Sequence, residues 1–230
     1  MKSLQIVTPH QKCIFNCPFC IAKAHSHNNS FINNYELNKE LWKNNLINVI
    51  NTNPDLKYVV ITGTNEPMQS KECVKDIIET VRKTNPSIQI EIQTRMYKED
   101  DIYNSVDVTC YSISNFNLIK RINPIGNTIR YVFILTDSFN GKRLDDYLNA
   151  ISKSVTQLTF KTLENSNGVN TELDNWINNH KVDNSTLEEL DKDINAYNGS
   201  LSIRIDYNCM DSTDRYKVFR EDGNVYEDWD

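Results

Sequence analysis

Long apolar runs are absent from this sequence. Nowhere in its 230 residues do eighteen apolar residues follow one another, so it offers no candidate transmembrane helix. The first residues, MKSLQIVTPHQK, have neither the apolar core nor the small-residue cleavage site of a signal peptide. We therefore expect a cytoplasmic protein that does not associate with a membrane.

Basic residues are too few for a broad nucleic-acid-binding surface. The chain has 25 Lys and Arg residues against 31 Asp and Glu residues, which gives a net charge of −6. Nucleic-acid-binding proteins depend on clustered Lys and Arg side chains to neutralise phosphates. The composition argues against nucleic acid as a partner and leaves room only for a small basic pocket.

Glycine and proline are also scarce, with six residues of each, whereas 39% of the residues are hydrophobic and 24% are charged. This composition favours a globular chain with a sizeable core over a disordered one. No internal repeat or low-complexity tract divides the sequence. We expect one domain over residues 1–230.

Short apolar runs alternate along the chain with segments of helical periodicity. This alternation is typical of β-α units around a parallel sheet, which predicts an α/β fold. Strands are expected at Leu4–Thr8, Tyr58–Thr62, Ile88–Gln93, Val106–Ile113, Ile129–Thr136 and Val155–Lys161, and helices at Asn38–Asn51, Lys71–Thr84, Leu144–Ser154 and Thr186–Asn198.

The pattern changes in the last part of the chain, about residues 165–230. Polar and apolar residues alternate in Leu201–Asp206, and the segments YKVFRE and NVYEDW are separated by Asp222-Gly223. A two-residue Asp-Gly turn between alternating segments is a strong hairpin signal. We expect C-terminal helices and a β extension attached to the main sheet.

Cysteines are few, and three of the six are scattered. Cys73, Cys110 and Cys209 occur singly, which excludes a secreted disulfide framework and suggests small buried apolar residues. The other three crowd into the stretch KCIFNCPFC as Cys13, Cys17 and Cys20. Clustered thiolates in a reducing compartment favour binding of a soft metal.

Three readings of this cluster remain open on spacing alone. A structural zinc needs a fourth ligand, which His25 or His27 could supply. An iron–sulfur cube held by three cysteines leaves one iron open to a small molecule. The third reading is three ordinary cysteines in a loop.

The cysteine motif resembles the signature of the radical S-adenosylmethionine (SAM) superfamily. That family places three cysteines, separated by three and two residues, in the loop after its first strand. The resemblance implies a partial (β/α)6 TIM-like barrel with a core over about residues 1–164. It also implies a [4Fe-4S] cluster on Cys13, Cys17 and Cys20, and it casts Phe19 as a contact to the adenine region of SAM.

A second segment carries the resemblance further. The sequence GTNEP after the second expected strand is similar to the family's Gly-Gly-Glu-Pro-like turn, which receives the amino group of SAM. It keeps the first Gly, the Glu and the Pro, but has one extra residue and no second Gly. The SAM contacts implied by the resemblance and by strand-end position are Gly63, Thr64, Glu66, Pro67, Thr94, Ser112, Ser114 and Thr136.

Side-chain alternation predicts a polar face inside the barrel. In the third expected strand, Gln89, Glu91 and Gln93 share one side, and helices must cover the other. Such a row indicates either a substrate chamber or internal ion pairs. Cations predicted on the same face are Arg130, Lys161 and Arg204. Arg95 and Lys161 lie closest to strand carboxyl ends, so we expect these two to act on the substrate.

The resemblance implies a reaction. A reduced cluster, fed by an electron donor such as flavodoxin or ferredoxin, would cleave SAM to a 5′-deoxyadenosyl radical that abstracts hydrogen from a small-molecule or peptide substrate. One alternative within the superfamily is an activase of a glycyl-radical enzyme. An alternative of another class is a non-catalytic zinc-binding module.

Overall fold

The computed structural model describes residues 1–9, 12–20, 23, 34–163, 165–166, 168–207 and 216–227. The proposed fourth zinc ligands, His25 and His27, lie outside these described residues, as does Cys209. The other five cysteines, Cys13, Cys17, Cys20, Cys73 and Cys110, lie within the described residues.

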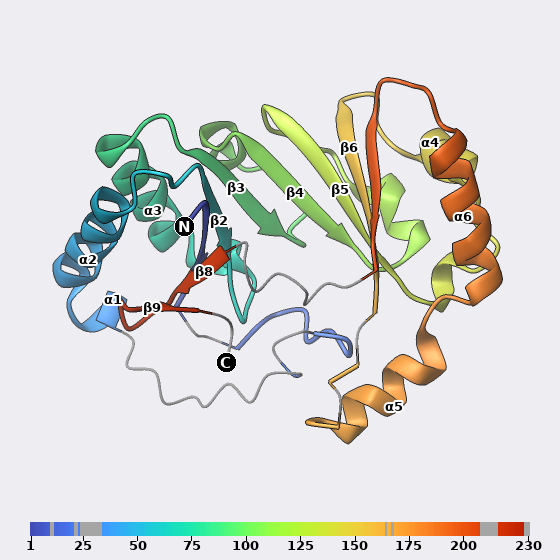
Figure 1. The fold of residues 1–230 in the computed structure, drawn as a ribbon, viewed down its shortest axis with the longest axis horizontal. Helices are drawn as coiled ribbons and strands as arrows, with labels where there is room; N and C mark the ends of the chain where they lie inside the picture. Colours follow the sequence, from blue (N-terminus) through green and yellow to red (C-terminus); the bar gives the residue numbers. More distant parts are fainter. Residues whose placement is uncertain are drawn as a thin grey trace.

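A nine-stranded sheet is the framework of the protein (Figure 1), with the order β7-β6-β5-β4-β3-β2-β1-β8-β9. All neighbouring strands run parallel except β8 and β9, which form an antiparallel pair. The strands are β1 (Ser3–Val7), β2 (Tyr58–Thr62), β3 (Gln89–Thr94), β4 (Val108–Ile113), β5 (Thr128–Leu135), β6 (Val155–Thr162), β7 (Ser202–Asp206), β8 (Tyr216–Phe219) and β9 (Val225–Tyr226).

Helices connect the strands and pack on the sheet. The α-helices are α1 (Asn34–Leu37), α2 (Lys39–Thr52), α3 (Lys71–Thr84), α4 (Leu144–Ala150), α5 (Thr171–His180) and α6 (Asn184–Ala196). Short 3₁₀ helices also occur among the described residues, namely η2 (Pro67–Ser70), η3 (Asp101–Ser105), η4 (Phe116–Arg121) and η5 (Asp137–Phe139). In the part of the chain that the structure describes, no helix has the length and apolarity needed to cross a membrane.

The two faces of the sheet differ in chemistry, because successive side chains of a strand point to opposite sides. Ile90 and Ile92 of β3 are fully buried in one apolar core together with Val74 and Ile77 of α3. Glu91 is half-buried on the other face. The helices therefore cover the apolar face, and the predicted polar row lies on the inner face of the sheet.

The predicted α/β fold is confirmed, and six β-α units in sequential order form an open sheet of the partial-barrel type. The C-terminal part contributes strands to both sides of the main sheet, whereas the sequence predicted only an attached β extension. Strand β7 pairs parallel to β6 and β8 pairs parallel to β1, so the chain extends both edges of the sheet. Alternation identifies a strand but does not reveal its partner, which is why these pairings were missed.

The C-terminal hairpin is confirmed, but its turn is longer than the two residues predicted. Arg220 and Asn224 close the turn, with the Arg220 amide donating to the Asn224 carbonyl at 3.0 Å. Gly223 has φ +81°, a backbone conformation that favours glycine. The turn is therefore of the three-residue kind, in which a glycine follows a type I turn.

Candidate functional site

The three clustered cysteines lie in the loop that follows β1, at the carboxyl ends of the parallel strands (Figure 1). Cys13, Cys17 and Cys20 are half-buried, and none of them is in a disulfide. Asn16 has φ +40°, which turns the backbone sharply before Cys17. The Cys20 amide then donates to the Cys17 carbonyl at 3.2 Å, so the loop holds its own turn.

Asn65 joins the start of this loop to the turn after β2. Its side-chain amide donates to the Pro9 carbonyl at 2.8 Å, and its oxygen accepts the Thr8 hydroxyl at 3.0 Å. A Cβ atom on Gly63 would lie 2.6 Å from that Asn65 oxygen, so the close approach requires glycine. Asn65 of the GTNEP segment thus has a structural role at the start of the cysteine loop.

Gln69 of η2 holds the cysteine loop from the other side. Its side-chain oxygen accepts from the Ile14 amide at 3.0 Å, and its amide group donates to the Lys12 carbonyl at 3.1 Å. This pair of hydrogen bonds flanks Cys13 and fixes the backbone there. No local pattern in the sequence signals this role, because Gln69 and the loop are more than fifty positions apart.

Glu66 is only 4% exposed, and its carboxylate is surrounded by donors from the protein itself. One oxygen accepts from the Thr94 hydroxyl at 2.6 Å and the Met68 amide at 3.1 Å, and the other accepts from the Arg95 amide at 2.8 Å. Burial raises the pKa of Glu66 above its usual value, although the three hydrogen bonds act in the opposite direction. A carboxylate has about four acceptor positions, so little capacity remains for a ligand.

Arg95 follows the end of β3 and reaches the cysteine loop. Its guanidinium donates to the Cys17 sulfur and, at 2.8 Å, to the Ser114 hydroxyl. The same group lies over two rings of the loop, 5.3 Å from the centre of Phe15 and 5.7 Å from that of Phe19. Arg95, predicted to act on the substrate, thus has its guanidinium against Cys17 and the two aromatic rings of the loop.

Hydrogen bonds link the carboxyl ends of several strands into one network. The Thr136 hydroxyl donates to the Ser114 carbonyl at 3.0 Å, which adds the end of β5 to the contacts made by Arg95 and Glu66. Residues on five different segments thus meet, as expected for the carboxyl face of a β/α sheet. The predicted residues brought together in this way are Cys17, Glu66, Thr94, Arg95, Ser114 and Thr136.

Helix α5 lies beside the cysteine loop; it is one of the C-terminal helices expected after about residue 165, although its bounds were not predicted. The Phe19 ring packs against Trp176 with centroids 5.7 Å apart, and the Asn170 amide donates to the Lys23 carbonyl at 3.0 Å. Asn170 also caps α5 by accepting from the Leu173 amide. That cap, followed by Leu173, Trp176 and Ile177 at helical spacing, was the signal that could have revealed the helix.

The remaining predicted contacts lie around this network. Thr64 is half-buried in the turn after β2, and Pro67 is buried at the first position of η2. The Ser112 carbonyl accepts the Tyr97 hydroxyl at 2.6 Å. Lys161 lies near the end of β6, half-buried on the inner face of the sheet.

On the inner face of the sheet, Arg130 forms an internal ion pair with Glu91, one of the two roles predicted for the polar residues there. Its guanidinium donates to Glu91 at 2.6 Å and to Gln157 at 2.7 Å. The Arg130 charge is therefore balanced within the sheet.

Outside the cluster, Cys73 and Cys110 are buried as predicted, and burial raises the pKa of the Cys110 thiol to about 12.

The donor set at the loop suits a soft metal or an iron–sulfur cluster, because it consists of three thiols that are not in disulfides. Within the described ranges, no three His, Cys, Asp or Glu side chains converge as metal ligands, so the thiols would have to turn toward one another. Beside Cys17, the Arg95 Nε–H is buried and has no hydrogen-bond partner among the described residues. An orphaned donor of this kind fits an anionic acceptor such as a cluster sulfide or a carboxylate.

No family model matches the sequence, and no curated protein matches it significantly.

Proposed function

We propose that the protein is a radical SAM enzyme. The observation that carries the proposal is the presence of three half-buried cysteines, none of them in a disulfide, within eight residues at the carboxyl edge of a parallel α/β sheet. Active sites of such folds open at this edge. The guanidinium of Arg95 contacts Cys17 and has an orphaned N–H, which supports an anionic group at this loop.

Cys13, Cys17 and Cys20 would hold a [4Fe-4S] cluster with one iron left for SAM. When reduced, this cofactor supplies the electron that cleaves SAM to a 5′-deoxyadenosyl radical, which abstracts hydrogen from the substrate. Reduction requires an electron donor such as flavodoxin or ferredoxin. The protein's contribution is to hold the thiols, orient SAM and exclude water.

The residues around the cysteine loop would have different roles in holding the loop and in binding the cofactor. Gln69 and Asn65 fix the cysteine backbone, and Glu66 orders Thr94 and Arg95 through its three hydrogen bonds. The Arg95 guanidinium, held by Ser114, presents its buried N–H next to Cys17 and would bind an anionic group of the cofactor or of SAM. The polar inner face of the sheet suits a polar small molecule or a peptide segment as substrate.

The test is anaerobic reconstitution with iron and sulfide, followed by reduction in the presence of SAM. We expect about four irons per chain and release of 5′-deoxyadenosine. Cys13→Ala, Cys17→Ala and Cys20→Ala should each lose both. Cys73→Ala and Cys110→Ala are matched controls, since both thiols are buried away from the loop.

The outcomes separate the proposal from its alternatives. Stoichiometric zinc without SAM cleavage would identify a non-catalytic metal-binding module. Retention of iron by the three loop variants would show that the ligands are assigned wrongly. Screening metabolites and peptides for stimulated release of 5′-deoxyadenosine would then identify the substrate.

A further inference from the structure

A cavity lies on the inner face of the sheet, at the opposite end of the strands from the cysteines. Its volume is about 790 Å³, within the usual range of small-molecule sites. It is lined by the amino-terminal parts of β1 to β4, together with Arg130 of β5 and Arg204 of β7. Four strand positions separate Glu91, in the cavity wall, from Arg95 at the cysteine loop, a distance of about 13 Å.

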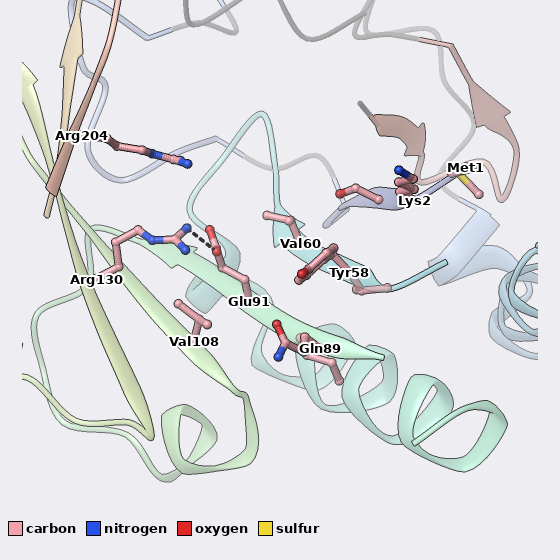
Figure 2. A pocket seen from close by; sticks show the side chains of 12 residues that line it. Met1, Lys2, Tyr58, Val60, Gln89, Glu91, Val108, Arg130 and Arg204 are labelled. Carbon is pink, nitrogen blue, oxygen red and sulfur yellow. Dashed lines mark hydrogen bonds and ion pairs between the residues drawn. The ribbon is translucent and has the colours of Figure 1, made fainter. Parts of the chain in front are cut away.

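The charges around this cavity are unbalanced. Among the described residues, its lining includes three cations, Lys2, Arg130 and Arg204, and one carboxylate, Glu91. Figure 2 shows Glu91 joined to Arg130, which accounts for one charge of each sign. Lys2 and Arg204 are the cationic side chains that remain, and Arg204 pairs loosely with Asp206, which is not part of the cavity lining.

Arg204 is the cation best placed to meet a ligand. Its side chain is 60% exposed, and in Figure 2 it extends from β7 into the cavity, across from Lys2. Its one ion-pair partner among the described residues is Asp206, at a loose 3.6 Å. Arg130, by contrast, is only 21% exposed and is held by Glu91 and Gln157.

Apolar side chains form part of the wall, so the cavity can bind more than a bare ion. Val60 and Val108 line it, and Tyr58, which is 48% exposed, presents an aromatic ring. A guanidinium recognises carboxylate and phosphate groups through paired hydrogen bonds. We propose that this cavity binds a small organic anion, with its carboxylate or phosphate group on Arg204 and an apolar body against Tyr58, Val60 and Val108.

The site does not depend on the proposed radical SAM activity, and binding can be measured on the purified chain without SAM. Benzoate and phenyl phosphate are suitable probes because they share an aromatic body and differ in the anionic group. Benzamide is the neutral control. We expect calorimetric titration to show binding of at least one anion, weaker binding at high salt and weaker binding of benzamide.

Substitution of Arg204 tests the contact directly. Arg204→Gln should lower the affinity for the anion roughly tenfold to a hundredfold, the value of a charge-assisted hydrogen bond. Arg121→Gln is the matched control, because Arg121 is exposed on η4 and does not line the cavity. Cys17→Ala should bind the probes like the wild type, which separates this site from the cysteine loop.

A chemical measurement covers the case in which Arg204→Gln fails to fold. Phenylglyoxal modifies accessible arginines, and mass spectrometry can compare Arg204 with Arg121 in the same wild-type molecule. The bound anion should protect Arg204 selectively. Equal affinity of wild type and Arg204→Gln, equal binding of benzamide, or no selective protection of Arg204 would each overturn the proposal.

Discussion

At the scale of single residues, polar side chains at the strand ends are engaged with one another. Glu66 illustrates this, because it is nearly inaccessible yet accepts three hydrogen bonds from two neighbouring segments. A buried acceptor with this many donors fixes the geometry of the groups around it. Its first contribution is therefore to order Thr94 and Arg95, and Arg95 in turn contacts the cysteine loop.

Glu66→Gln should lower the free energy of unfolding by about 1–3 kcal/mol, because the new amide group is a donor that must face the Thr94 hydroxyl or a backbone N–H. Urea denaturation followed by circular dichroism measures this change. Glu72→Gln is the control, since Glu72 is 84% exposed in a surface ion pair. Unchanged stability of Glu66→Gln, with weaker SAM binding alone, would instead show that Glu66 is a direct ligand contact.

At the scale of elements, the two C-terminal helices bring the last third of the chain to the site. Helix α5 packs Trp176 on Phe19, and α6 leads on to β7. Both helices begin at capped residues, Asn170 and Asp183, whose side chains accept from the backbone of the first turn. Such caps satisfy amide groups that a helix cannot pair internally.

The cap of α6 should make stability depend on pH. Asp183 accepts from the Thr186 amide at 2.6 Å, and this hydrogen bond lowers the pKa of Asp183. A lowered pKa means that the carboxylate contributes stability above its ordinary value of 3.8, and that this contribution is lost as pH falls further. Asp183→Ala should therefore reduce the free energy of unfolding by about 1 kcal/mol at neutral pH and by less at acid pH.

Thermal unfolding between neutral and acid pH measures this difference. Glu188→Ala is the control, because it removes a charge from the same helix at an exposed position away from the cap. A destabilisation by Asp183→Ala that stays constant down to the most acid pH would show that the carboxylate charge has no part in the cap.

At the scale of the whole molecule, β8 makes the C-terminus part of the main sheet. Phe219 of β8 is fully buried and lies against Trp42 of α2, with ring centroids 5.0 Å apart. The Trp42 indole N–H also donates to the Arg220 carbonyl at 3.1 Å. The strand thus joins the central sheet and the first helical layer.

Phe219→Ala should lower the free energy of unfolding by about 3–5 kcal/mol, because it removes a large side chain from the core. Tryptophan fluorescence and far-UV circular dichroism in urea should report one shared transition. Tyr207→Ala is the control, as Tyr207 is 53% exposed. Loss of the Trp42 signal well before the sheet unfolds would mean that the C-terminal strands form a separate appendage.

The sequence alone determined the fold class and the polar inner face. Both follow from local periodicity: apolar runs of strand length alternate with helical segments, and side chains such as Glu91 and Ile92 alternate along a strand. The spacing of Cys13, Cys17 and Cys20 likewise predicted their place in the loop after the first strand. These features depend on residues close together in the chain.

Only the tertiary structure decided the strand pairings and hydrogen bonds that join residues far apart in the sequence. The parallel pairing of β7 with β6 and of β8 with β1 joins segments whose own patterns name no neighbour. The hydrogen bonds of Gln69 to the cysteine loop and of Arg95 to Cys17 also join residues that are far apart in the sequence. A hydrogen bond across more than fifty positions leaves no periodic trace in the sequence, because it is formed by the packing of strands that local propensity alone does not arrange.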